Sequence, residues 1–251
     1  MLQRESSALS LIEKLFIVNL LLTRQESGFL LAWESMFSIE KLMQFPIWFV
    51  PFLFALCFHE FAHGWVAKLR GDRTAEMMGR LTMNPLAHMD FVGTLMMPFL
   101  AFMTGIPIFF GWAKPVPVNS RNLKSPRTDM FWIALAGPAS NVLLAMAGSL
   151  LMFLSFRFLA EQSFLMALLE FLKTFILINL FLAVFNLLPI HPLDGGKVLA
   201  RFLPAKANYW LESNEQVLSI VLLMLIMGGG TRLLVYPVSW IYETLIFWAR
   251  V

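Results

Sequence analysis

The sequence has few charged residues, a single cysteine and no concentrated basic stripe. Only 14% of its 251 residues are charged and 59% are hydrophobic, whereas soluble domains are about a quarter charged. This composition excludes an ordinary soluble domain and predicts a membrane protein. Cys57 cannot form an internal disulfide and fits no cysteine zinc motif, so we interpret it as a small buried residue. The net charge of +3 comes without interleaved basic and aromatic residues, and we expect no nucleic-acid partner.

Three apolar runs are long enough to cross a bilayer, whose core takes about 20 residues of helix. They cover residues 42–67, 129–157 and 164–190. Lys and Arg near membrane ends mark the cytoplasmic side. Such residues follow the first and third runs, at Lys68, Arg70, Arg73 and Arg80, and at Lys197, Arg201 and Lys206. Both ends are therefore predicted to face the cytoplasm.

The remaining segments are less regular. Residues 1–40 mix apolar and charged positions, which predicts one or two amphipathic helices on the membrane surface, with a weak first span as the alternative. They lack the pattern of a cleaved signal peptide. Residues 91–113 are uncharged but flanked by basic residues on both sides, which favours a re-entrant segment. Residues 216–249 fit one span plus an interfacial helix, or two short spans joined by a turn at 228–230.

The first run carries the most unusual residues of the chain. His59 and His63 are four residues apart, so in a helix they lie on one face, one turn apart. That spacing lets two imidazoles reach one zinc ion, with Glu60 beside the open position of the metal. Two histidines merely hydrogen-bonded to neighbouring helices are the alternative. Glu60 argues against it, because ionisable groups at membrane depth are costly without a role.

A catalytic zinc site needs a third protein ligand. The favoured candidate is Asp194, which follows Pro189 and Pro192 at the end of the third run. His191 is a rival ligand. In the other alternative, Asp194 is simply a turn residue. In this hypothesis zinc-bound water is the nucleophile and Glu60 is the general base and acid. Asn141 and Asn186 could contact the substrate or simply join helices. We expect His88 to be an ordinary polar loop residue.

Three ordered motifs resemble the site-2 protease family of intramembrane zinc metalloproteases. They are His59-Glu60-Phe61-Ala62-His63, Gly137-Pro138-Ala139-Ser140-Asn141, and Asn186 to Gly195 as N-x-x-P-x-x-x-L-D-G. The stretch Gly111 to Asn119 is similar to that of the small prokaryotic members. The resemblance implies His59, His63 and Asp194 as ligands of one zinc ion and Glu60 as the catalytic residue. It also implies that Asn141 and Asn186 could contact the substrate backbone or the oxyanion.

The expected fold is thus an all-α polytopic membrane protein. It has a three-helix catalytic core with a re-entrant or β-like segment after the first core helix, plus flanking helices. We divide the chain into N-terminal interfacial helices at 1–40, a metalloprotease core at 41–206 and C-terminal membrane helices at 207–251. We expect no room for a PDZ or CBS domain.

The predicted function is hydrolysis of peptide bonds in transmembrane segments of membrane-protein substrates, with regulated intramembrane proteolysis as one setting. The expected partners are such a substrate and the lipid bilayer, in a bacterial or archaeal cell membrane with the active site near the cytoplasmic face. A metal-binding transporter or channel is the alternative, because intramembrane histidines can also line an ion path. The sequence does not indicate an oligomeric state.

Overall fold

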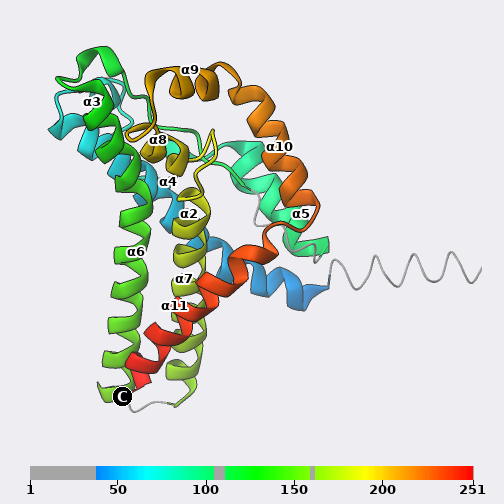
Figure 1. The fold of residues 1–251 in the computed structure, drawn as a ribbon. Coiled ribbons are helices and arrows are strands. Elements are labelled where there is room, and N and C mark those ends of the chain that lie inside the picture. Colours follow the sequence, from blue (N-terminus) through cyan, green and yellow to red (C-terminus); the bar gives the residue numbers. More distant parts are fainter. Residues whose placement is uncertain (1–37, 105–110, 159–161, 251) are drawn as a thin grey trace, which may run out of the picture.

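The computed structural model describes residues 38–104, 111–158 and 162–250, and these form helices joined by turns and non-helical segments, without a β-strand among them (Figure 1). Three helices are long and apolar enough to cross a membrane: α2 (Ile39–Leu69), α6 (Pro126–Phe158) and α7 (Gln162–Asn186). Helices α2 and α6 contain the first two predicted spans, whereas α7 ends at Asn186, four residues before the predicted end of the third span at residue 190. The prediction of an all-α, multi-pass integral membrane protein is confirmed.

Helix α7 packs against different neighbours on its two faces. Ile176 and Leu180 join Met152 of α6 in a cluster that also includes α11 (Arg232–Arg250). Ile178 and Leu182 point to the opposite face, where they meet Phe52 and other residues of α2. Figure 1 shows α6 and α7 upright, with α11 running across them. The three spans therefore form one packed unit around α7.

The end of α7 places the following helix beside α2 and α6. Pro189 cannot continue the ladder of backbone hydrogen bonds, and α7 ends at Asn186. The chain then turns into α8 (Asp194–Ala200), whose first residue is buried. Figure 1 shows α8 near the upper end of the spans. The helix break thus brings Asp194 to the first two spans, as the sequence predicted.

The C-terminal region contains three helices, α9 (Ala205–Ser213), α10 (Glu215–Met227) and α11. Helices α9 and α10 are bent by 69° and count as a fourth span only if taken together. The predicted turn lies between α10 and α11, where Gly229 adopts φ of 82°, a backbone conformation that favours glycine.

Short elements connect α2 to α6. They are α3 (Thr74–Met77), α4 (Pro85–His88), a π-helical turn (Phe91–Met96), α5 (Met97–Thr104) and a 3₁₀ turn (Ser120–Asn122). Residues 91–104 form a helix too short to span, and residues 111–119 are non-helical. These features agree with a re-entrant path, but residues 105–110 lie outside the described residues. So do residues 1–37, and with them nearly all of the predicted N-terminal interfacial helices.

Candidate metal centre

His59, His63 and Asp194 bring three ligand atoms to one point between α2, α6 and α8. The Nε2 atoms of the two histidines are 3.0 Å apart. Asp194 Oδ2 lies 3.0 Å from His59 Nε2 and 3.2 Å from His63 Nε2. All three residues are buried, and the three atoms lie within 4.8 Å of one another. The residues that the sequence predicted as ligands are therefore brought together.

The hydrogen bonds of the two Nδ1 atoms indicate that a cation belongs between the three ligand atoms. His59 Nδ1 is 2.7 Å from Asn141 Oδ1, and His63 Nδ1 is 2.6 Å from the backbone oxygen of Ile133. Both partners accept hydrogen bonds, so each Nδ1 carries the proton and each Nε2 presents a lone pair. Two lone pairs and a carboxylate oxygen then converge with no proton between them. A cation bound by all three atoms removes this repulsion.

Asn141 holds His59 in this orientation. Its side chain is fully buried, and its amide nitrogen donates to the Ala55 backbone oxygen at 3.1 Å and to Asn179 Oδ1 at 2.9 Å. These two bonds fix which end of the amide faces His59. Asn141 thus contacts the imidazole, with all its polar atoms engaged by the protein. Asn179, absent from the sequence prediction, supports it from α7, and its only sequence signal is an amide within an apolar run.

Gly137 leaves space for the ligand atoms. A Cβ atom built at this position would lie 2.5 Å from His63 Nε2 and 2.6 Å from His59 Nε2. Any side chain would therefore collide with both imidazoles, at the point where a metal ion would sit. The close approach of α6 to α2 therefore requires a glycine at this position of the second motif. The donor set of two imidazoles and one carboxylate suits zinc.

Glu60 faces the same space from α2. Its Oε2 atom accepts a hydrogen bond from the Val116 backbone N–H at 2.8 Å. A cavity of about 440 Å³, the metal-centre cavity, is lined by His59, Glu60, His63 and Asp194. Non-helical residues Pro115, Val116 and Val118 form one of its walls. The carboxylate thus lies beside the three ligand atoms, held by the segment that follows the proposed re-entrant path.

A second cavity of about 460 Å³, the apolar cavity, reaches the same residues from the side of α10. It is lined by His59 and Glu60 together with apolar residues of α2, α7 and α10, among them Leu56, Leu182, Phe185, Ile220 and Leu223. Asn186 lines both cavities, and its amide nitrogen donates to the Leu182 backbone oxygen at 3.0 Å. Asn186 therefore faces the space where a bound chain could lie, in contrast to Asn141.

The two remaining histidines lie apart from the ligand group. His191 is buried, but it is not in the group of residues that could hold a metal ion within the described part of the chain. His88 differs from the expectation of an ordinary loop residue. It ends α4, is only 2% exposed, and its Nε2 atom lies 2.9 Å from the Thr82 backbone oxygen. Packing of α4 against α2 buries it, which the loop-like sequence did not indicate.

Comparison with known sequences assigns the chain to a protein family. The chain matches the family model described as "Peptidase family M50" over residues 47–167 and 154–228. The chain belongs to peptidase family M50, the site-2 proteases. This confirms the resemblance seen in the three motifs. As an M50 member, the protein is a zinc metalloprotease with Zn²⁺ as its cofactor.

Curated relatives carry the same activity in their names. The chain is 36% identical over 194 residues to "Putative zinc metalloprotease YwhC" of Bacillus subtilis, which covers 74% of this chain and 85% of the relative. It is 30% identical over 229 residues to "Putative zinc metalloprotease Rip2" of Mycolicibacterium smegmatis, covering 88% and 81%. The Rip2 protein of Mycobacterium tuberculosis H37Rv is 30% identical over 206 residues, covering 80% and 75%. No solved structure matches the chain significantly.

Proposed function

We propose that this M50 protease cuts peptide bonds inside transmembrane segments of membrane-protein substrates, near the cytoplasmic face of a prokaryotic cell membrane. The observation that carries the proposal is the position of Glu60. Its carboxylate shares one cavity with three metal-ligand atoms, between helices long enough to cross a bilayer. The family match does not favour a transporter or channel. Release of a substrate domain by such a cut is the setting in which we expect regulated proteolysis.

The residues have separate roles in this proposal. His59, His63 and Asp194 hold one zinc ion, and Asn141 and the Ile133 carbonyl orient the two imidazoles. A zinc ion held there supplies polarisation of the peptide carbonyl and activation of water. Glu60 accepts a proton from the attacking water and passes it to the leaving nitrogen. The hydrogen bond from Val116 keeps the carboxylate directed at the cavity before the substrate binds.

The apolar cavity supplies a route for the substrate. A helix has its backbone hydrogen bonds satisfied internally, so the scissile segment must unwind locally before its carbonyl can be attacked. Apart from Asn186 and Ser219, the walls that α7 and α10 contribute are apolar, which suits a membrane segment, and Glu60 is among the lining residues. Residues 113–118 offer a non-helical edge where an unwound strand could pair. Asn186, which lines the metal-centre cavity together with this segment, could hydrogen-bond the substrate backbone.

The decisive experiment compares the wild-type protein with Glu60→Gln in detergent. Both proteins should retain about one zinc per chain, because Glu60 is not among the three ligand residues. Only the wild type should cleave a panel of single-span membrane proteins, with a loss in Glu60→Gln of at least about 10²-fold. Zinc is measured by mass spectrometry and cleavage by gel electrophoresis.

Two results would contradict the proposal. One is a wild-type protein that binds zinc but cleaves only soluble peptides. The other is a Glu60→Gln variant that cleaves membrane substrates as fast as the wild type. Glu40→Gln is a matched control, since Glu40 also lies on α2 but is exposed and far along the helix from the histidines.

A further inference from the structure

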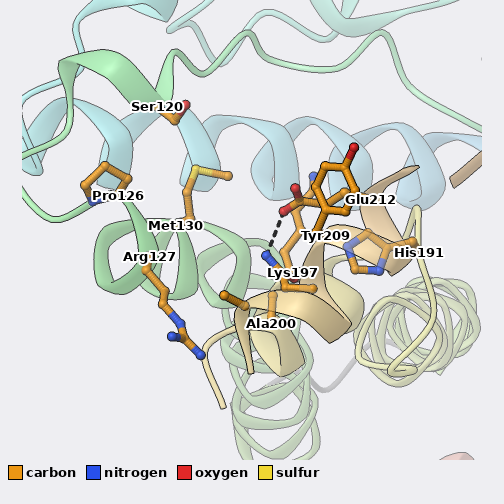
Figure 2. A pocket seen from close by; sticks show the side chains of 11 residues that line it. Ser120, Pro126, Arg127, Met130, His191, Lys197, Ala200, Tyr209 and Glu212 are labelled. Atoms are coloured by element: carbon orange, nitrogen blue, oxygen red, sulfur yellow. Dashed lines mark hydrogen bonds between the residues drawn. The ribbon is translucent and has the colours of Figure 1, made fainter. Parts of the chain in front are cut away.

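A third cavity lies next to the metal-centre cavity and is not used in the mechanism above. It has a volume of about 390 Å³ and lies between the beginning of α6, α8 and α9. Figure 2 shows its lining from close by. Its polar lining residues are mainly Arg127, His191, Lys197, Asn208, Tyr209 and Glu212. We call it the α8–α9 cavity. Lys197 and Met130 line both this cavity and the metal-centre cavity, so the two spaces adjoin.

Lys197 is the residue that connects the two spaces. It lies one turn after Asp194 on α8, and its Nζ atom is 3.9 Å from Asp194 Oδ1. This distance is longer than a hydrogen bond. The ammonium carries three donors, and about half of the side chain is exposed. Lys197 therefore presents a positive charge with free hydrogen-bonding capacity beside the metal centre.

His191 adds a second donor. It is 95% buried, and its Nδ1 atom lies against Gly196 without a hydrogen-bond partner in the described part of the chain. A buried Nδ1 with no acceptor favours the tautomer that carries its proton on Nε2. Figure 2 shows the imidazole ring directed into the space beside Tyr209 and Glu212. In this tautomer His191 donates into the cavity.

The charges of the cavity favour an anion. Lys197 and Arg127 are cationic, and Arg127 also donates to the backbone oxygen of Leu203. The single acid among the lining residues, Glu212, already accepts a hydrogen bond from the Asn208 amide at 2.8 Å. Two cations thus face one carboxylate among the lining residues. A carboxylate is the anion that a peptide substrate can supply in such a place.

We propose that the α8–α9 cavity is a substrate subsite that binds an Asp or Glu side chain close to the scissile bond. Lys197 would be the main contact and His191 a second donor. This inference rests on the proposed function, since it assumes a peptide chain in the metal-centre cavity. It predicts a preference for substrates whose membrane segment is followed by an acidic residue at one or two fixed positions.

Binding can be measured without cleavage. The zinc-loaded Glu60→Gln protein in detergent is titrated with fluorescent peptides that contain one hydrophobic segment and carry either Asp or Asn at successive flanking positions. At one or two neighbouring positions the Asp peptide should bind about tenfold more tightly than its Asn counterpart. Lys197→Met should abolish this preference and Lys197→Arg should retain it. Lys206→Met is the matched control, because Lys206 is exposed on α9 and does not line the cavity.

The outcomes separate this inference from the proposed function. Equal binding of Asp and Asn peptides at every position would overturn it, as would a preference that survives Lys197→Met. Should Lys197→Met lose zinc, His191→Phe keeps an aromatic ring, removes the donor and should reduce the preference by about threefold. Failure of the wild type to cleave would leave an observed preference intact.

Discussion

Gly137 has no side chain, and this leaves the space that the metal centre needs. In Gly137→Ala the new Cβ would need space now taken by both imidazoles, at 2.5 and 2.6 Å. Since neither histidine can move away without losing its Nδ1 partner, we expect zinc to be held at least tenfold more weakly and activity to fall with it. Zinc retention against a chelator series, measured on purified protein, tests this expectation.

Gly148→Ala is the matched control on the same helix. Its Cβ would lie 2.9 Å from a side-chain carbon of Ile176, in the packing of α6 against α7 and away from the histidines. Overpacking should lower the free energy of unfolding by about 1–3 kcal/mol, and the melting temperature should fall with it. Zinc retention should stay normal. Equal zinc loss in both variants would indicate that general packing, rather than space at the ligands, explains Gly137.

Single residues also show what sequence alone can predict. The spacing of His59 and His63 is a local property of a helix, so their convergence could be predicted without a structure. After the break at Pro189 and Pro192, the structure groups Asp194, and not His191, with the two histidines. Asn179 and the burial of His88 depend on contacts between elements far apart in the chain. No local pattern marks such contacts.

Among the elements, the segment 111–119 depends on a buried carboxylate. Asp72, fully buried after α2, accepts hydrogen bonds from the Asn119 backbone N–H at 2.7 Å and the Asn122 amide at 2.8 Å, and from the N–H and hydroxyl of Thr74. It thereby ties the turn after α2 to the segment whose Val116 N–H holds Glu60. This tie connects residues 47 positions apart, and no local sequence pattern indicates it.

Asp72→Asn should loosen this tie. Burial raises the pKa of Asp72, but the hydrogen bonds from Thr74, Asn122 and Asn119 outweigh it and keep the pKa below the ordinary value of 3.8. A lowered pKa means that the ionised form stabilises the fold, fully above about pH 3.8 and progressively less as the pH falls through the folded-state pKa. At pH 7 the free energy of unfolding of the variant should be about 1–3 kcal/mol lower than that of the wild type, and its melting temperature should be lower.

Melting curves between pH 7 and pH 3 provide the measurement. The stability difference between wild type and Asp72→Asn should shrink as the pH falls below about 3.8. Glu76→Gln is the control. Ion pairs with Arg73 and Lys68 lower the pKa of Glu76 to about 2, but these contacts lie at the surface and should contribute little. A pH-independent difference for Asp72→Asn would contradict the role of its ionised carboxylate.

Across the whole molecule, the metal centre lies toward the end of the spans where the basic residues after α2, before α6 and in α8 gather. The Ile133 carbonyl that holds His63 is only about 10 Å along α6 from its first residue. Lys124 and Arg127 lie at that end, and α6 continues for roughly 50 Å to Phe158, longer than the apolar core of a bilayer. Charge counting predicts that this end faces the cytoplasm, because topology depends on loops next to the spans rather than on tertiary contacts.

Single cysteines at the two ends of α6 test this orientation. Lys124 and Phe158 are both exposed, whereas the native Cys57 is buried and should give no background. In intact cells a membrane-impermeant maleimide should label Phe158→Cys but not Lys124→Cys; inside-out vesicles should show the reverse. The wild-type protein controls for Cys57. Labelling of both positions from one side would contradict a spanning α6, and the opposite pattern would place the metal centre near the outer face.

With the predicted pattern, the carboxylate subsite beside Lys197 would meet the cytoplasmic flank of a substrate helix, where acidic residues can remain hydrated until they bind.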